Sequence, residues 1–192
     1  MAEHDPLSGD GDFIPSADFI DLLDEGRATE VRAARAREHA LRRMAEEGAQ
    51  LAGTLIDLAE RRSPVILATV AGRHHHGVVV GVGGDYCVVR TDGGVEIHLC
   101  LDALTTLRPA PGERHVVASG ERRPPTDHLL LEVLGRAVGD RRPVSLVTRT
   151  GEVVAGELRA VGMDVVSLSP HGNAGETCYV AASAVSEAFF AD

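Results

Sequence analysis

The chain has 192 residues, of which 44% are hydrophobic and 25% charged, and its net charge is −10 with arginine as the only basic residue type besides histidine. This composition is typical of a soluble globular protein, and no apolar run reaches the ~20 residues of a membrane-spanning helix, so we expect a cytoplasmic protein with no membrane partner. The acidic excess disfavours a general nucleic-acid binder, because contacts with phosphates need surplus cations.

The N-terminal part of the sequence divides into two segments. Residues 1–15 carry prolines, glycines and four acids, with neither the basic nor the apolar region of a secretory signal, and they predict a disordered acidic arm. Residues 16–62 are rich in alanine, with apolar residues at spacings of three, four and seven. This periodicity predicts a helical segment, as one long helix or as two with a break near Gly26 or Gly48.

Arginines decorate the polar faces of this helical segment. One interpretation is a basic surface for RNA, DNA or another anionic partner, and the other is a solvated face with glutamates as intrahelical partners. The second interpretation is favoured. The candidate nucleic-acid residues are Arg32, Arg35, Arg42 and Arg43.

An internal repeat follows. Residues 64–89 match residues 143–168 at a constant offset of 79, and the matching positions include glycines, an aspartate and a proline. Shared positions report what the fold needs, so any particular function is expected where the copies differ. The matched pairs are Pro64/Pro143, Gly72/Gly151, Gly77/Gly156, Gly83/Gly162 and Asp85/Asp164.

Each copy predicts a helix and five short strands. Alternating apolar residues indicate the strands, and glycines stand at the expected turns and bends. Beyond a loop that is two residues longer in the second copy, the offset becomes 81. The predicted fold is mainly β with N-terminal α, in which a long helix precedes two tandem helix-plus-five-strand small barrels. The predicted segments are an arm (1–15), a helical segment (16–62), a first barrel (63–108), a linker (109–126) and a helix with a second barrel (127–192).

The order of elements and the pattern V-x-L-x-T-x-x-G-x4-G resemble the Sm-like (SH3-like) small β-barrel superfamily, whose members assemble strand to strand and often bind RNA. The chain also resembles a set of uncharacterised actinobacterial proteins with an acidic and then helical N-terminus. The aspartate and asparagine that the Sm family's first motif expects are replaced by Gly83 and Cys87, or by Gly162 and Val166. The family's arginine-glycine pair is also absent. These departures disfavour RNA binding.

No catalytic constellation is evident, so we expect neither an enzyme nor a cofactor. Histidines cluster only in the first copy, at residues 74–76, and the second copy has none there. Neighbouring strand residues point to opposite faces, so a metal site is a weak hypothesis, and exposed loop histidines are the favoured interpretation. The weak metal candidates are His74, His76, His98 and Cys100.

The copies differ most on one outward face. Four apolar residues of the first copy stand where the second has serine, glutamate or arginine, and they predict a covered, interacting surface made of Ile66, Val70, Val78 and Val80. We therefore expect a non-enzymatic binding or scaffold protein that associates with another protein or with itself. The alternative is a divergent Sm-like regulator that binds RNA or DNA through the arginine-rich helix.

Overall fold

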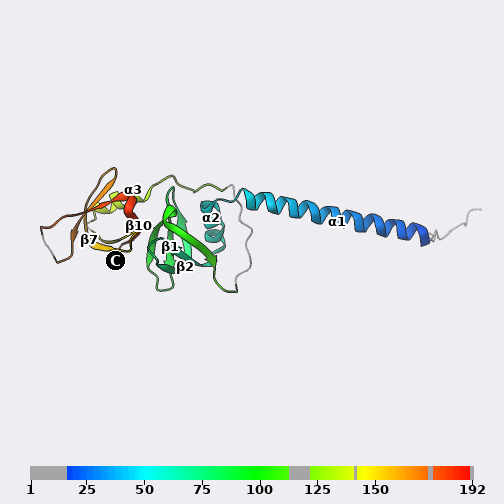
Figure 1. Cartoon of the computed structure of the whole chain (residues 1–192), viewed down its shortest axis with the longest axis horizontal. Helices are drawn as coiled ribbons and strands as arrows, with labels where there is room; N and C mark the ends of the chain where they lie inside the picture. Colours follow the sequence, from blue (N-terminus) through cyan, green and yellow to red (C-terminus); the bar gives the residue numbers. More distant parts are fainter. Residues whose placement is uncertain (1–16, 113–121, 141, 173–174, 191–192) are drawn as a thin grey trace, which may run out of the picture. The chain divides into compact units, whose positions relative to one another are not determined.

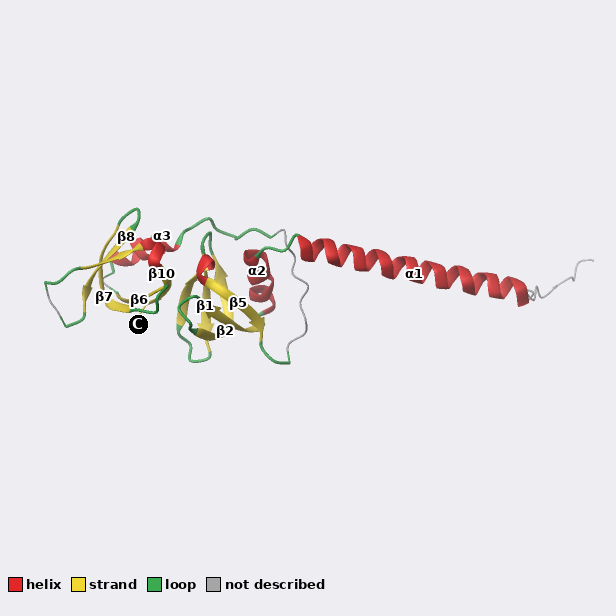
Figure 2. Ribbon diagram, in the orientation of Figure 1, coloured by secondary structure: helices red, strands yellow, loops and turns green. Residues whose placement is uncertain are grey.

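The computed structural model describes residues 17–112, 122–140, 142–172 and 175–190. The predicted acidic arm and the middle of the predicted linker lie outside these ranges. Within them the chain is mainly β, with an N-terminal helix, which confirms the predicted class (Figures 1 and 2). No helix in the described ranges is both long and apolar enough to cross a membrane.

Three α-helices are present in the described ranges. The first helix ends at Glu47, close to Gly48, which is one of the two positions considered for a break, and it continues through the other, Gly26. Its residues 27 and 29–47 are almost all exposed. Arg62 caps the C-terminus of helix α2, and its left-handed φ of 52° closes the last turn. The helices are α1 (Ala17–Glu47), α2 (Leu51–Arg61) and α3 (Leu130–Val138).

In the described ranges, ten antiparallel strands form one sheet with the order β5-β1-β2-β3-β4-β10-β6-β7-β8-β9. We call β1–β5 the first strand set and β6–β10 the second strand set. In each set a short 3-10 turn, η1 (Leu101–Ala103) or η2 (Ala182–Ala184), separates the last two strands. The strands are β1 (Pro64–Thr69), β2 (His74–Val82), β3 (Tyr86–Thr91), β4 (Glu96–Cys100), β5 (Leu104–Pro109), β6 (Pro143–Thr148), β7 (Val153–Val161), β8 (Val165–Pro170), β9 (Cys178–Ala181) and β10 (Val185–Phe190).

The two strand sets pair their strands in matching registers. Pro64 lies opposite Val78 in the first set, and Pro143 lies opposite Glu157 in the second, which is the sequence offset of 79. The β2–β3 and β7–β8 pairs each carry an irregularity at the matching place. The same turn hydrogen bonds also recur, so both sets follow one backbone plan.

Two matched glycines explain part of this plan. A Cβ atom at Gly77 would collide with the carbonyl oxygen of Arg90 on the neighbouring strand, and a Cβ at Gly156 would collide with that of Ser169. Only glycine therefore lets these strands approach so closely. Each strand set has its own apolar core, closed by α2 in the first set and by α3 in the second.

Candidate assembly site at the central strand junction

The two strand sets join through one pair of strands, which we call the central junction. Strand β4 of the first set pairs with β10 of the second, with Leu99 opposite Glu187 and Ile97 opposite Phe189. Because the backbone ladder continues across this pair, all ten strands belong to one sheet. Each set thereby uses one of its two edge strands inside the chain.

A buried carboxylate lies at the centre of the junction. Glu187 on β10 has no exposed surface, and its Oε1 atom accepts a hydrogen bond of 2.7 Å from the Thr69 hydroxyl. Its Oε2 atom lies 3.1 Å from Arg73 Nε and 3.1 Å from His75 Nε2. All three partners come from β1, β2 and their connecting turn, which we call the first hairpin. The first hairpin therefore binds the last strand of the second set.

The electrostatic environment keeps this carboxylate ionised. Burial alone would raise the pKa of Glu187, but the contacts with His75 and Thr69 and the charges of His75 and Arg73 outweigh it and lower the pKa below its usual value. A buried charge is tolerated only when it is paired in this way. Removing Thr69, Arg73 and His75 would therefore leave the buried carboxylate of Glu187 without compensation.

Phe189 extends this contact along the same face of β10. The guanidinium of Arg73 lies 5.4 Å from the centre of the Phe189 ring, and the His75 ring meets it edge to face at 6.4 Å. Phe189 also packs against the core of the first set. The first hairpin therefore recognises both a charge and an aromatic ring, two residues apart on one strand.

The opposite face of β4 seals the second core. Tyr86, Val88 and Cys100 of the first set pack with residues of the second core. The His98 ring lies between Tyr86, at 5.7 Å, and Phe190, at 5.1 Å between ring centres. Burial lowers the pKa of His98 despite the nearby Glu96 carboxylate, so the ring is neutral at pH 7 and acts as an aromatic packing group.

Two polar contacts outside the strands complete the junction. The Leu130 N–H at the start of α3 donates a hydrogen bond of 2.7 Å to the Asp85 side chain of the first set. Arg149 on the second set pairs with Asp102, with 2.5 Å between Nη2 and Oδ1. Asp85 therefore caps a helix that belongs to the other strand set.

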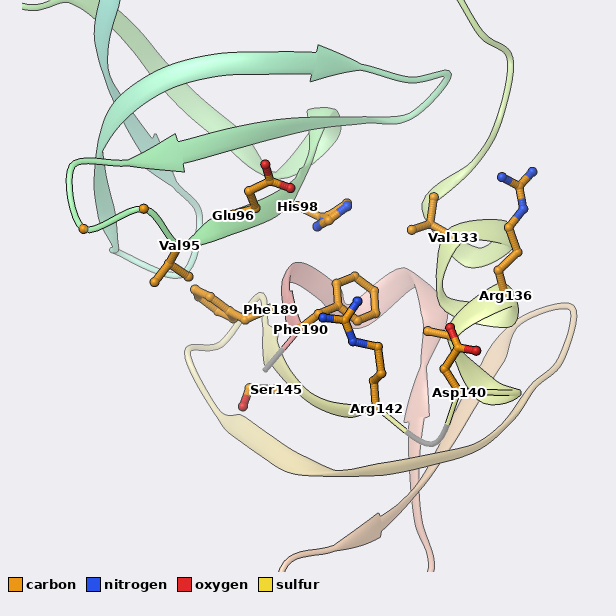
Figure 3. Close-up of a pocket in the computed structure, with 13 residues that line it drawn as sticks. Val95, Glu96, His98, Val133, Arg136, Asp140, Arg142, Ser145, Phe189 and Phe190 are labelled. Atoms are coloured by element: carbon orange, nitrogen blue, oxygen red, sulfur yellow. The ribbon is translucent and has the colours of Figure 1, made fainter. Parts of the chain in front are cut away.

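A cavity of about 790 Å³ lies beside the junction, between the start of β4, helix α3 and strand β10 (Figure 3). Phe189, Phe190 and Val133 provide apolar walls, and the charged side chains around it include Arg136 and Asp140. Both signs of charge are present, so the lining does not select a ligand of one charge.

The four residues of the predicted apolar surface lie on the first hairpin, on β1, β2 and the turn between them. Val70 and Val80 are exposed by 42% and 41%, whereas Ile66 and Val78 are half-buried. Ile66 pairs with His76 and Arg108 on the neighbouring strands. Whether these four residues form an interaction surface stays a prediction.

The weak metal candidates do not form one group. His74 and His76 are exposed on β2, and His98 and Cys100 lie on β4, two strands away in the sheet. Among the described residues no group of three or more histidine, cysteine or acidic side chains has the geometry to hold a metal ion. Burial and the charge of Asp102 raise the pKa of the Cys100 thiol to about 12, so it is a poor ligand and a poor nucleophile.

The candidate nucleic-acid residues are Arg32, Arg35, Arg42 and Arg43, all exposed on α1. Arg42 pairs with Glu38 at 2.7 Å, one turn earlier on the helix. This contact is of the intrahelical kind that the sequence favoured.

The sequence interpretation missed Glu187 and Phe189. The repeat contained a signal, because at the offset of 81 the corresponding residues of β5 are Thr106 and Arg108, so the two copies differ at both positions.

A scan against protein-family models, a search of curated proteins and a search of solved structures each found no match.

Proposed function

We propose that this chain is a tandem pair of Sm-like small barrels derived by duplication, and that its function is self-association, in which β9 of one copy pairs with β5 of the next. The single observation that carries the proposal is the central junction. There the chain makes this kind of strand pairing once, inside itself, between β4 and β10.

The remaining edge strands are the counterparts of those two strands. At the offset of 81, β9 corresponds to β4, and β5 corresponds to β10. Within the described residues, β5 and β9 end the sheet, so each has a strand neighbour on one side only. Unpaired edges present rows of free N–H and C=O groups, which are templates for a further strand.

The register of the proposed β9–β5 junction follows from the register of the central junction. Leu99 lies opposite Glu187 and His98 opposite Ala188 in the central junction, so Val180 would lie opposite Thr106 of the next copy, and Tyr179 opposite Leu107. Tyr179 is 72% exposed in the single chain. Its counterpart, His98, is covered by Phe190 in the central junction.

The helix contact also has an open counterpart. Asp85 caps α3 across the central junction, and the matching groups are Asp164 and the N–H of Leu51 at the start of α2. The N-cap residue of α2, Gln50, provides no side-chain hydrogen bond to the helix. A β9–β5 junction would bring Asp164 of one copy to this helix end in the next.

Such an interface joins two different surfaces, the β9 edge of one copy and the β5 edge of the next. After each addition, one β9 edge and one β5 edge remain free at the ends of the assembly. Head-to-tail contacts of this type give a ring when the rotation closes and a filament when it does not. The proposed function is therefore that of a scaffold built from copies of this chain, and its oligomeric state depends on the protein concentration.

Sedimentation velocity of the full chain over a wide concentration range tests the proposal. We expect species larger than one chain, and the Tyr179→Asp variant should weaken association roughly tenfold or more, because a charge would be placed opposite an apolar residue in the new junction. A wild-type chain that stays monomeric at every concentration would contradict the proposal.

Val80→Asp is the matched control. Val80 is exposed on β2 but does not lie on an edge strand, so this change should leave association unaltered. Association that is lost in Val80→Asp and kept in Tyr179→Asp would instead assign docking to the apolar face of the first hairpin.

A further inference from the structure

We infer that Arg108 of one copy and Glu152 of the next form the contact that specifies the β9–β5 junction. This inference rests on the proposed self-association and names the side chains that select the partner edge. It comes from comparing the charges at the central junction with those at the matching positions of the two remaining edges.

The central junction defines which positions meet. Arg73 of the first hairpin lies over the Phe189 ring and beside the Glu187 carboxylate. The residue matching Arg73 is Glu152, and the residues matching Phe189 and Glu187 are Arg108 and Thr106. The same geometry at the β9–β5 junction would therefore place the Arg108 guanidinium beside the Glu152 carboxylate.

Both residues are available for this contact. Arg108 and Glu152 are exposed, on β5 and on the turn before β7 respectively. In the part of the chain that the structure describes, neither side chain has an ion-pair partner, whereas Arg73 is paired with Glu187. A strand neighbour supplied by another copy would give each its opposite charge.

Two other edge pairings between copies, β10 with β9 and β5 with β4, are unfavourable, so the contact between Arg108 and Glu152 gives specificity. If β10 met β9 of another copy, the buried Glu187 would face Glu152 and lose Thr69, Arg73 and His75. If β5 met β4 of another copy, Arg108 would face Arg73. Like charges at such an interface disfavour the wrong partner, so only β4–β10 and β9–β5 are compatible.

Charge reversal tests this assignment in the full chain. Arg108→Glu would place a second carboxylate against Glu152, and Glu152→Arg would place a second guanidinium against Arg108, so each variant alone should associate about tenfold more weakly than the wild type. The double variant Arg108→Glu/Glu152→Arg restores opposite charges and should recover wild-type association. Both sites are exposed, and equal thermal unfolding of all variants checks that the fold is kept.

Mixing the two single variants is the sharper experiment. Copies with Arg108→Glu would alternate with copies carrying Glu152→Arg, and every junction between them would then join opposite charges. We expect the mixture to associate more strongly than either variant alone, and the difference should shrink at ~1 M salt, where charges are screened within about 3 Å.

The outcomes separate the inference from the function on which it rests. A wild-type chain that associates while the reversed variants associate equally well, or while the mixture gives no recovery, would overturn the role of Arg108 and Glu152 and leave self-association intact. A strictly monomeric wild type would overturn both.

Discussion

The two strand sets share a backbone plan but differ in what lies along their edges. The first hairpin presents Arg73 and His75 and is engaged by Glu187 of β10, whereas the matching hairpin of the second set presents Glu152 and Val154. The paired edges carry a buried charge cluster and two phenylalanines, and the unpaired edges carry exposed polar and aromatic residues. One backbone plan therefore carries two kinds of strand edge, and among the described residues only β4 and β10 pair with each other across the two sets.

The shared plan is tested where the sets are identical. Gly77→Ala and Gly156→Ala should each lower the free energy of unfolding by about 3 kcal/mol, because the new Cβ collides with a carbonyl oxygen of the neighbouring strand. Urea denaturation measures the change. Gly135→Ala is the control, because a new Cβ at Gly135 on α3 meets open space, and this variant should not destabilise the chain. Gly94→Ala is unsuitable as a control because the φ of Gly94 is 81°. A large loss at one glycine and none at its counterpart would break the equivalence of the sets.

The difference between the edges is tested at matched positions of β10 and β5. Glu187→Ala should lower the free energy of unfolding by about 2–3 kcal/mol, since Thr69 and His75 would keep buried polar atoms with their shared acceptor removed. Thr106→Ala, at the corresponding exposed position, should change it by less than about 0.5 kcal/mol. If urea denaturation gave Glu187→Ala a loss of unfolding free energy as small as that of Thr106→Ala, the carboxylate would not stabilise the central junction.

A smaller effect is expected from protonation of the same group. The folded pKa of Glu187 lies below the ordinary value of 4.5, so its ionised form stabilises the fold above pH 4.5, and this contribution is lost as the pH falls through the folded pKa. The free energy of unfolding of the wild type should therefore fall below pH 4.5 more steeply than that of Glu187→Gln. Parallel pH profiles for the two proteins would exclude a stabilising charge at this site.

The mainly β class and the N-terminal helix were predictable because their signals are local. Alternating apolar residues, as in Val65 and Leu67, place side chains on one face of a strand whatever the rest of the chain does. The glycine pairs mark close approaches of neighbouring strands, and the interruption near Gly48 follows from the end of a helical pattern. Between β4 and β5 lies a 3-10 turn, which the alternation of apolar residues does not indicate.

The central junction was not predictable in the same way. By its local pattern Glu187 is a polar residue at a strand position, which usually faces solvent. It is buried because a hairpin 118 residues earlier in the chain supplies its hydroxyl partner. The apolar residues Val70 and Val80 attracted attention from sequence alone, yet the strand sets meet through β4 and β10.

Strand segments, glycine positions and the differences between the two halves can be inferred from the amino-acid sequence, because they depend on neighbours along the chain and on backbone sterics. The choice of which edges pair is visible only in the folded chain. All strand edges offer the same N–H and C=O groups, so the choice depends on side chains brought together from distant parts of the sequence.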